Sequence, residues 1–407
     1  MFLDRLKTLF RKNDGKQKLK TEYTSPRNEY YGTVAERYST MQMVLLVLLT
    51  LFVLVCLIIN SEWISYENFF FFFSDYSEYL TSADSDIENV IYDTGDFYDF
   101  GVFGGKFAVA GRGGVSLYTR SGRTAFSDTD TIPNPKIETS ERFMLVYDAG
   151  GKSYRVYNVF TEVYSEKTEY QIYGAAAADN GSYAIITGDG SHTSCVMVYN
   201  RRFEVIQTIG RASYIVDVSM TPSGDRVAVL SYSQENGEFI TQLSLVKTSK
   251  NQEYANIKIN GTFPLYCSYT EKGCVNLVCE DRIVSYNTKG DKVSEFIFPE
   301  NASLKDADVN RYGCTAVLGS MGGNIVLVFD RNGQMVYNDE TGNGVTSVAM
   351  WDKHTFLLDE QNVTRIELST GNKTTVERDT DSKAYMIVLG EDEILLCMSS
   401  RAKYIKI

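Results

Sequence analysis

Histidine is scarce in this sequence, and this scarcity limits the chemistry that the chain can carry out. The 407 residues include two histidines, His192 and His354. Neither stands in a His-Glu-x-x-His pattern or another metal-binding spacing. We expect both in solvated loops, His192 in a hairpin loop and His354 in a turn. Histidine-based catalysis and histidine-bound metals are therefore not expected.

Other motifs of catalysis and ion binding are also missing. The sequence has no Gly-x-Ser-x-Gly elbow and no phosphate-binding loop, and it has no calcium loop of the form Asp-x-Asp-x-Asp-Gly. Asp128 and Asp130 are the one weak candidate for an ion site. We therefore predict no enzymatic activity, no cofactor and no metal centre.

The chain has no Cys-x-x-Cys pair, which argues against a redox or zinc role for its cysteines. Of seven cysteines, Cys56 lies in a long apolar run and six follow it. Four of the six stand in apolar strand-like segments, where cysteine serves as a small buried residue. We expect mostly free thiols. Three disulfides remain an alternative, with Cys267 and Cys274 as the first pair to consider.

Positive charge is in deficit overall. Lys and Arg total 40 against 52 Asp and Glu, so the formal net charge is −12 and the pI is near 4.9. Nucleic-acid binding usually needs a basic face and is not expected. Hydrophobic residues make up 43%, which is enough for a large core.

The first 40 residues reverse this balance. They hold nine Lys or Arg and five acids, whereas residues 61–407 carry a formal charge of −16. With no sustained apolar period, residues 1–40 are predicted to be a basic cytoplasmic arm that is largely disordered. Five of its residues fit an electrostatic contact with anionic lipid or a cytoplasmic partner: Arg11, Lys12, Lys16, Lys18 and Lys20. Alternatively, the arm only enforces membrane topology.

Residues 41–60 contain no charge and are predicted to form a transmembrane helix. About 20 residues at ~1.5 Å each cover a hydrocarbon layer of ~30 Å. A buried core helix or a cleaved signal peptide fits the flanking charges less well. The apolar side chains predicted to face the hydrocarbon layer include Met43, Leu45, Leu48, Leu51, Leu54 and Ile58.

The charges on either side of this span indicate its orientation. No Lys or Arg occurs from Glu62 to Asp99, against nine before the span. The positive-inside rule then places the N-terminus in the cytoplasm and the C-terminal part outside the cell membrane. Aromatic residues of the juxtamembrane segment 61–85 predict an interfacial belt: Trp63, Tyr66, Phe69 and Phe73. Packing of the Phe run under the distal domain is the alternative.

From about residue 95 the chain repeats. Turn glycines followed by strands fall at Gly181, Gly224, Gly273 and Gly313. A second series of turns has a period of about 42 residues and includes Gly122, Thr161, Arg201, Ser249, Gly290, Gly333 and Gly371. Four short strands per unit at this period are typical of a β-propeller.

The phase of the repeat predicts how the ring closes. The last unit has three strands, Ala384–Leu389, Glu393–Met398 and Ala402–Ile407, and its outer strand could come from Asp86–Asp93. Such closure hides two sheet edges. We therefore predict an all-β domain over residues 86–407, an eight-bladed propeller with a seven-bladed alternative.

These repeats resemble WD-repeat and pyrroloquinoline-quinone-type propellers. No Trp-Asp pair ends a blade in register, and the regular tryptophans of quinoprotein propellers are missing. The whole layout resembles uncharacterised single-pass membrane proteins of Gram-positive anaerobes that carry an extracytoplasmic propeller. That resemblance implies a location but no chemistry.

Two functions follow as hypotheses. The first is a non-enzymatic protein-binding scaffold or assembly factor at the cell envelope, held in the bilayer by one helix. The second is a receptor for glycans or small ligands, or a glycan-processing enzyme, that uses the central channel. A deep axial pocket with clustered acids would favour the second, and an apolar channel the first. The sequence does not determine the partner or the oligomeric state.

Overall fold

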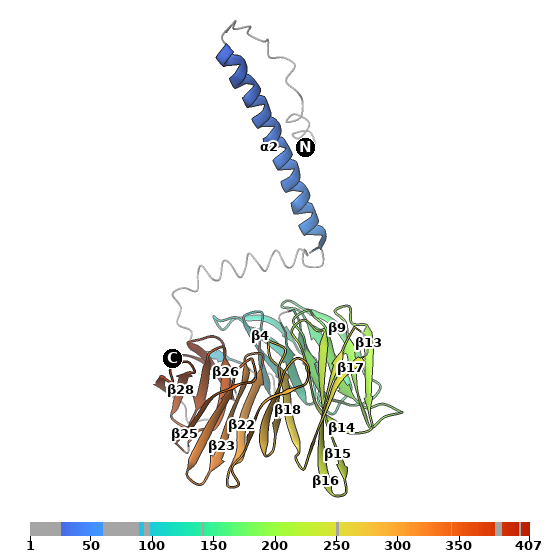
Figure 1. Cartoon of the computed structure of the whole chain (residues 1–407), viewed down its shortest axis with the longest axis vertical. Coiled ribbons are helices and arrows are strands. Elements are labelled where there is room, and N and C mark those ends of the chain that lie inside the picture. Colours follow the sequence, from blue (N-terminus) through green and yellow to red (C-terminus); the bar gives the residue numbers. More distant parts are fainter. Residues whose placement is uncertain are drawn as a thin grey trace. The chain divides into compact units, whose positions relative to one another are not determined.

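A computed structural model shows an N-terminal helix and a β-propeller as two separate units (Figure 1). It describes residues 26–59, 89–92, 98–140, 142–249, 252–342, 344–378, 385–398 and 400–407. The predicted interfacial and basic residues lie outside the described residues: Trp63, Tyr66, Phe69, Phe73, Arg11, Lys12, Lys16, Lys18 and Lys20.

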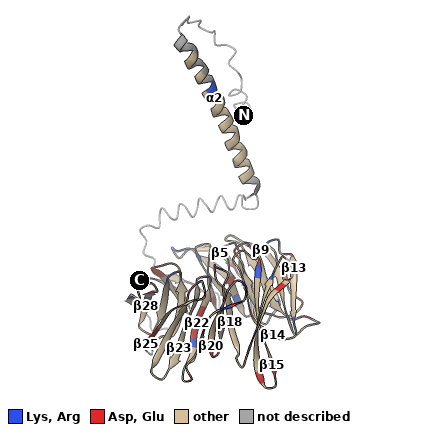
Figure 2. Cartoon of the chain, viewed as in Figure 1, with Lys and Arg blue, Asp and Glu red and all other residues tan. Residues whose placement is uncertain are grey.

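The helix, α2, runs from Pro26 to Ile59 and is apolar over most of its length. Its segment Arg37–Cys56 has a mean hydropathy of 2.4, and none of it is buried inside the protein. The helix sequence contains no charged residue after Arg37, and most of the helix is tan in Figure 2. The Thr50 hydroxyl donates to the Leu46 carbonyl (2.8 Å), so its polar group is satisfied within the helix. By length and composition, α2 could cross a membrane.

The predicted span residues lie on this helix, and all but Ile58 have described side chains. Those five are exposed: Met43, Leu45, Leu48, Leu51 and Leu54. The helix is longer than predicted, because residues 26–40, expected to be largely disordered, continue it. Nucleation is the costly step of helix formation, so an apolar helix extends into a polar flank at little cost. Proline also suits the first helical position, where its missing N–H has no intrahelical partner.

The propeller consists of eight four-stranded antiparallel sheets, or blades, which follow one another along the chain. The first four blades comprise β2 (Asp99–Phe103), β3 (Lys106–Gly111), β4 (Gly114–Tyr118), β5 (Thr124–Asp128); β6 (Pro135–Thr139), β7 (Met144–Asp148), β8 (Ser153–Tyr157), β9 (Glu162–Lys167); β10 (Ile172–Ala177), β11 (Tyr183–Thr187), β12 (Ser194–Tyr199), β13 (Val205–Arg211); and β14 (Tyr214–Met220), β15 (Arg226–Glu235), β16 (Glu238–Lys247), β17 (Gln252–Asn260).

The last four blades comprise β18 (Pro264–Tyr269), β19 (Val275–Cys279), β20 (Arg282–Tyr286), β21 (Lys292–Ile297); β22 (Ser303–Asn310), β23 (Gly313–Ser320), β24 (Gly323–Phe329), β25 (Met335–Thr341); β26 (Ser347–Trp351), β27 (His354–Leu358), β28 (Asn362–Glu367), β29 (Lys373–Glu377); and β30 (Tyr385–Val388), β31 (Glu393–Cys397), β32 (Arg401–Lys406), β1 (Asn89–Ile91). First strands of successive blades contact each other, so they line the axis of the ring.

The eighth blade joins the two ends of the propeller, as predicted. Its strand order is β1-β32-β31-β30, in which β1 pairs antiparallel with β32. In this register Val90 lies opposite Ala402, and both are fully buried. Eight blades are therefore confirmed over seven. The second series of turns is also confirmed, because each of its seven members lies between the third and fourth strands of a blade.

The hydrophobic core lies between the blades. Each of eight clusters joins buried side chains of two neighbouring blades, including the cluster between the eighth and first. Second strands such as β7 and β11 are buried along their whole length, since neighbours cover both faces. Because both faces of these strands are buried, their sequences are continuous apolar runs.

The ring has two faces, which the strand directions distinguish. The first face carries the connections between blades and the turns between second and third strands. The second face carries the turns between first and second strands and between third and fourth strands. Because β1 occupies a fourth-strand position, the chain enters the propeller at the second face.

The cysteines are free thiols, as expected. The alternative bridge between Cys267 and Cys274 is wrong, because the register of β18 and β19 sets Cys267 opposite Leu277. The expectation for His354 is also wrong. It begins β27 opposite Trp351 and is 8% exposed, since the turn before it takes only two residues.

Candidate functional site

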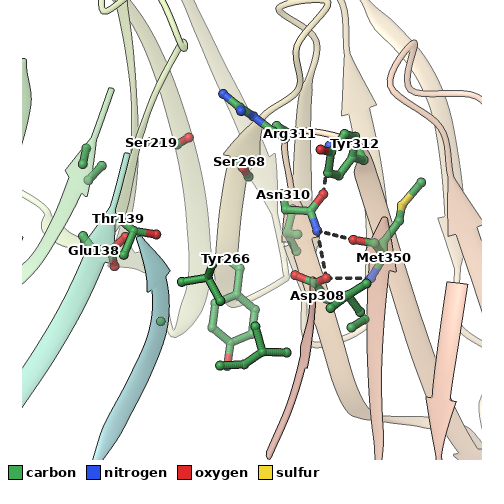
Figure 3. A pocket seen from close by; sticks show the side chains of 18 of the residues that line it. Glu138, Thr139, Ser219, Tyr266, Ser268, Asp308, Asn310, Arg311, Tyr312 and Met350 are labelled. Atoms are coloured by element: carbon green, nitrogen blue, oxygen red, sulfur yellow. Dashed lines mark hydrogen bonds between the residues drawn. The ribbon is translucent and has the colours of Figure 1, made fainter. Parts of the chain in front are cut away.

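A cavity of about 880 Å³ lies along the axis of the propeller. Its walls come from the first strand of every blade, or from the turn that follows it. Figure 3 shows Glu138 and Thr139 on one side of the cavity and Asp308 and Asn310 on the other. This size is in the range of small-molecule pockets.

Carboxylates are the main polar groups of this cavity: Glu138, Asp179, Asp217, Asp306 and Asp308. The sequence alone could not select them from 52 acids. Four of them share a place on first strands, and Asp179 lies in the turn after one, a pattern that becomes visible only when the blades are aligned. Arg311 is the one Lys or Arg among the residues that line the cavity in the described structure.

Acids on first strands join neighbouring blades; Asp217 and Asp306 line the cavity, and Asp99 begins β2. In three places a carboxylate on one first strand accepts a backbone N–H from the next first strand: Ile137 donates to Asp99 (2.8 Å), Cys267 to Asp217 (2.8 Å) and Val348 to Asp306 (2.9 Å). First strands of different blades share no ladder, so these N–H groups would otherwise lack a partner. The carboxylates therefore have a structural role.

Asp308, two residues after Asp306 on β22, makes a further link of this kind. It accepts the Met350 N–H (2.8 Å) and the Asn310 side-chain amide (2.8 Å), which also donates to the Met350 carbonyl (3.0 Å) (Figure 3). Burial raises the pKa of Asp308 to about 6, and the nearby negative Asp306 adds to the rise. Burial likewise raises the pKa of Asp217 to about 6.

Glu138 differs from these acids because no described group donates a hydrogen bond to its carboxylate. It lies deep in the protein and opens onto the cavity, where its side chain is partly exposed. Burial, together with the negative charges of Asp217 and Asp99, raises the pKa of Glu138 to about 8, and Lys136 only partly offsets this. Glu138 is the cavity carboxylate that remains available to a ligand.

An ion-pair network crosses the cavity at the second face. Asp179 of the third blade pairs with Arg311 of the sixth. Arg311 also lies 4.0 Å from Glu271, which pairs with Arg331 (3.2 Å), and Arg331 in turn pairs with Asp352. The one Lys or Arg of the described cavity lining, Arg311, is therefore already paired with a carboxylate.

The first face of the ring carries a group of exposed tyrosines that we call the tyrosine rim. It consists of four exposed side chains from first strands of the third, fourth, fifth and eighth blades: Tyr173, Tyr214, Tyr266 and Tyr385, exposed by 59%, 59%, 50% and 71%. Tyr266 lines the cavity as well, and Tyr385 packs against Phe100, another lining residue (6.1 Å between ring centroids). Tyr266 therefore borders the cavity directly, Tyr385 reaches it through Phe100, and the other two tyrosines stand on the same face of the ring.

The candidate ion site at Asp128 and Asp130 is occupied by an arginine. Arg155 pairs with both carboxylates at 2.8 Å, and the Tyr157 hydroxyl donates to Asp128 (2.7 Å). In the described part of the chain, no group of three or more His, Cys, Asp or Glu side chains could hold a metal ion. His192, in a hairpin loop as predicted, pairs instead with Asp189 (2.7 Å).

Solved structures with the same fold include three with little sequence likeness. The computationally designed protein Ika8 has a TM-score of 0.55 at 11% identity, over 79% of this chain and 100% of that chain. Sqt1 of Saccharomyces cerevisiae has a TM-score of 0.55 at 10% identity, over 79% and 100%. BamB of Moraxella catarrhalis has a TM-score of 0.53 at 10% identity, over 79% and 97%. These likenesses show the propeller fold alone.

A comparison with curated proteins finds no match. A family sequence profile, however, matches residues 73–407, which take in the whole propeller and most of the chain. The protein therefore belongs to the family described as "Family of unknown function (DUF5711)".

Proposed function

We propose that this protein is a membrane-anchored, extracytoplasmic scaffold that binds a protein partner without catalysing a reaction. An apolar helix long enough to cross a bilayer supports the anchor. The excess of Lys and Arg before that helix supports a cytoplasmic N-terminus and an external propeller. Propeller-type folds commonly present a rigid face to other proteins.

The observation that carries this proposal is the distribution of exposed apolar side chains. Twelve large hydrophobic side chains are exposed on the described propeller, and eight of them stand at the first face: Ile91, Tyr173, Tyr214, Phe239, Tyr266, Ile297, Met321 and Tyr385. Exposed aromatic and Met side chains are enriched at the centres of protein interfaces. The first face lies opposite the face where the chain enters the propeller.

One element extends this face. The β15–β16 hairpin has ten-residue strands, whereas most other strands have five to seven residues. Near its tip, Phe239 is 38% exposed and packs against Phe263 (5.3 Å) and Tyr232 (6.0 Å). This aromatic cluster holds the hairpin firmly, so it adds a preorganised surface to the first face.

The cavity favours a second candidate function, the binding of a small ligand or glycan. Clustered carboxylates with raised pKa values in a deep pocket are what that hypothesis predicts. Three of them accept backbone N–H groups and Asp179 pairs with Arg311, which gives these four a structural role. Glu138 is the remaining group that supports the second candidate, and one free carboxylate is less than a glycosidase requires.

Photo-crosslinking in living cells tests the scaffold proposal. A photoreactive residue is placed in the full-length protein at Met321 or Tyr385 on the first face, with Met335 and Ile206 on the second face as matched controls. We expect the same partner to be captured from both first-face positions and from neither control. Equal capture from both faces, or capture from neither, would contradict the proposal, and fluorescent glycan fragments then become the next probe.

A further inference from the structure

We propose that the first face binds a protein segment in which an Arg or Lys side chain is flanked by apolar residues. The cationic group enters the axial cavity, and the apolar neighbours rest on the tyrosine rim. This inference deepens the proposed function and rests on it.

The rim specifies the apolar part of the partner. Its four tyrosines leave half or more of each side chain exposed. Tyrosine offers a large contact area with few rotatable bonds, so covering it costs little side-chain entropy. Aromatic faces also attract Arg and Lys, which favours a cation passing between them.

The cavity specifies the charge of the inserted side chain. Five carboxylates line it against one cation, Arg311, and that cation is already paired with Asp179. Lys136, on the strand that carries Glu138, pairs with Asp99 (3.8 Å). No other Lys or Arg is among the described lining residues, and the negative charges of Asp217 and Asp99 act against ionisation of Glu138. A cation removes that repulsion, whereas an anionic or apolar group gains nothing from it.

The depth of the cavity matches a long side chain. Cys267 and Ile137 each donate a backbone N–H to a carboxylate on the preceding first strand, so they occupy equivalent positions in their blades. The residues just before them, Tyr266 and Lys136, therefore lie at the same level of the ring. Glu138 lies two residues beyond Lys136 along its strand, and therefore about 6.6 Å deeper than the rim. An extended Arg or Lys side chain covers such a distance while its backbone stays at the first face.

A pair of peptides tests the proposal on the full-length protein in lipid nanodiscs. One probe is acetyl-Leu-Leu-Arg-Leu-Leu-amide with a fluorophore, and the other carries citrulline, a neutral analogue, in place of arginine. We expect the arginine peptide to bind about tenfold more tightly. At pH 8.5, above the pKa of about 8 for Glu138, Glu138→Gln should reduce its affinity by about fivefold and leave the citrulline peptide unaffected. Glu340→Gln, on the exposed outer strand β25, is the matched control and should change neither.

Three results would overturn the proposal. These are equal affinity of the two peptides, no binding of the arginine peptide up to roughly 1 mM, and equal binding by the Glu138→Gln variant. Competition by Ca²⁺ alone, without any preference between the peptides, would assign the cavity to a metal ion instead. None of these results affects crosslinking from Met321, so the two proposals can fail separately.

Discussion

At the scale of single residues, Glu138 combines a raised pKa with the lack of a hydrogen-bond partner. Three other cavity acids, Asp217, Asp306 and Asp308, also lie on first strands but accept backbone N–H groups, so their charge is stabilised in part. Glu138 faces two negative neighbours, Asp217 and Asp99, and its ionisation works against the fold. Its place in the structure therefore costs stability at neutral and alkaline pH.

This cost predicts a pH-dependent effect of Glu138→Gln. The folded protein holds its proton on Glu138 up to a pKa of about 8, whereas the unfolded chain releases it near the ordinary value of 4.5. The folded state binds more protons in this interval, so wild-type stability falls as pH rises from about 4.5 to about 8.

We expect Glu138→Gln to have little effect at pH 4.5 and to raise the free energy of unfolding by about 2 kcal/mol at pH 8.5. This is less than the full linkage value because the cavity admits water. Urea unfolding followed by circular dichroism at both pH values measures it. A gain of equal size at both pH values would show that packing, not ionisation, is responsible.

At the scale of elements, the turns determine where each blade can form. Asn236 and Gly237 make the two-residue turn of the long β15–β16 hairpin, and both have positive φ (53° and 87°). Such a turn matches the twist of the strands that it joins. Gly313 has a different role. It begins β23 at φ 147°, where a Cβ atom would lie 2.1 Å from the Phe329 carbonyl oxygen.

Two alanine substitutions separate these roles. Gly237→Ala meets no atom within 4 Å, so it should lower the free energy of unfolding by about 1 kcal/mol through backbone strain alone. Gly313→Ala adds a clash with backbone and should cost about 3 kcal/mol or more. Denaturant midpoints of the two variants provide the comparison. Equal losses would mean that the backbone around Gly313 relaxes to accept the methyl group.

At the scale of the whole molecule, closure of the ring depends on the short strand β1, which pairs with the last strand, β32. β1 has three residues, yet Val90 and the following Tyr92 are buried between the eighth and first blades. The Tyr92 hydroxyl donates to the carbonyls of Met398 and Arg401, and its ring packs against Phe107 (5.9 Å). Tyr92 thus ties both ends of the propeller together.

Tyr92→Ala should therefore destabilise the entire propeller. We expect a loss of about 4 kcal/mol in the free energy of unfolding, typical of removing a buried aromatic ring. Hydrogen exchange should show the loss in all blades if the ring unfolds as one unit. Loss confined to the eighth blade would mean that the blades unfold separately. Tyr385→Ala, at the exposed rim, serves as the control and should change stability little.

The sequence by itself determined the helix, the blade count and the closure by both termini. These features depend on local patterns, an uncharged run and turns at a period of about 42 residues, which physical chemistry translates directly into structure. It also indicated free, buried cysteines, since apolar strands surround them. The helix predicted from the sequence begins at residue 41, whereas α2 begins at Pro26. The part of a helix that extends beyond an apolar run has no hydrophobic pattern from which it could be predicted.

Only the tertiary structure decided where a ligand could bind. Glu138, Asp217 and Asp308 are far apart in the sequence and have no common motif, and the ring brings them to one axis. The same holds for Asp179 and Arg311, 132 residues apart. The tyrosine rim emerged in the same way, because exposure depends on the blades around each side chain and not on its neighbours in the chain. Long-range packing creates these sites, and a single sequence does not encode it in any local pattern.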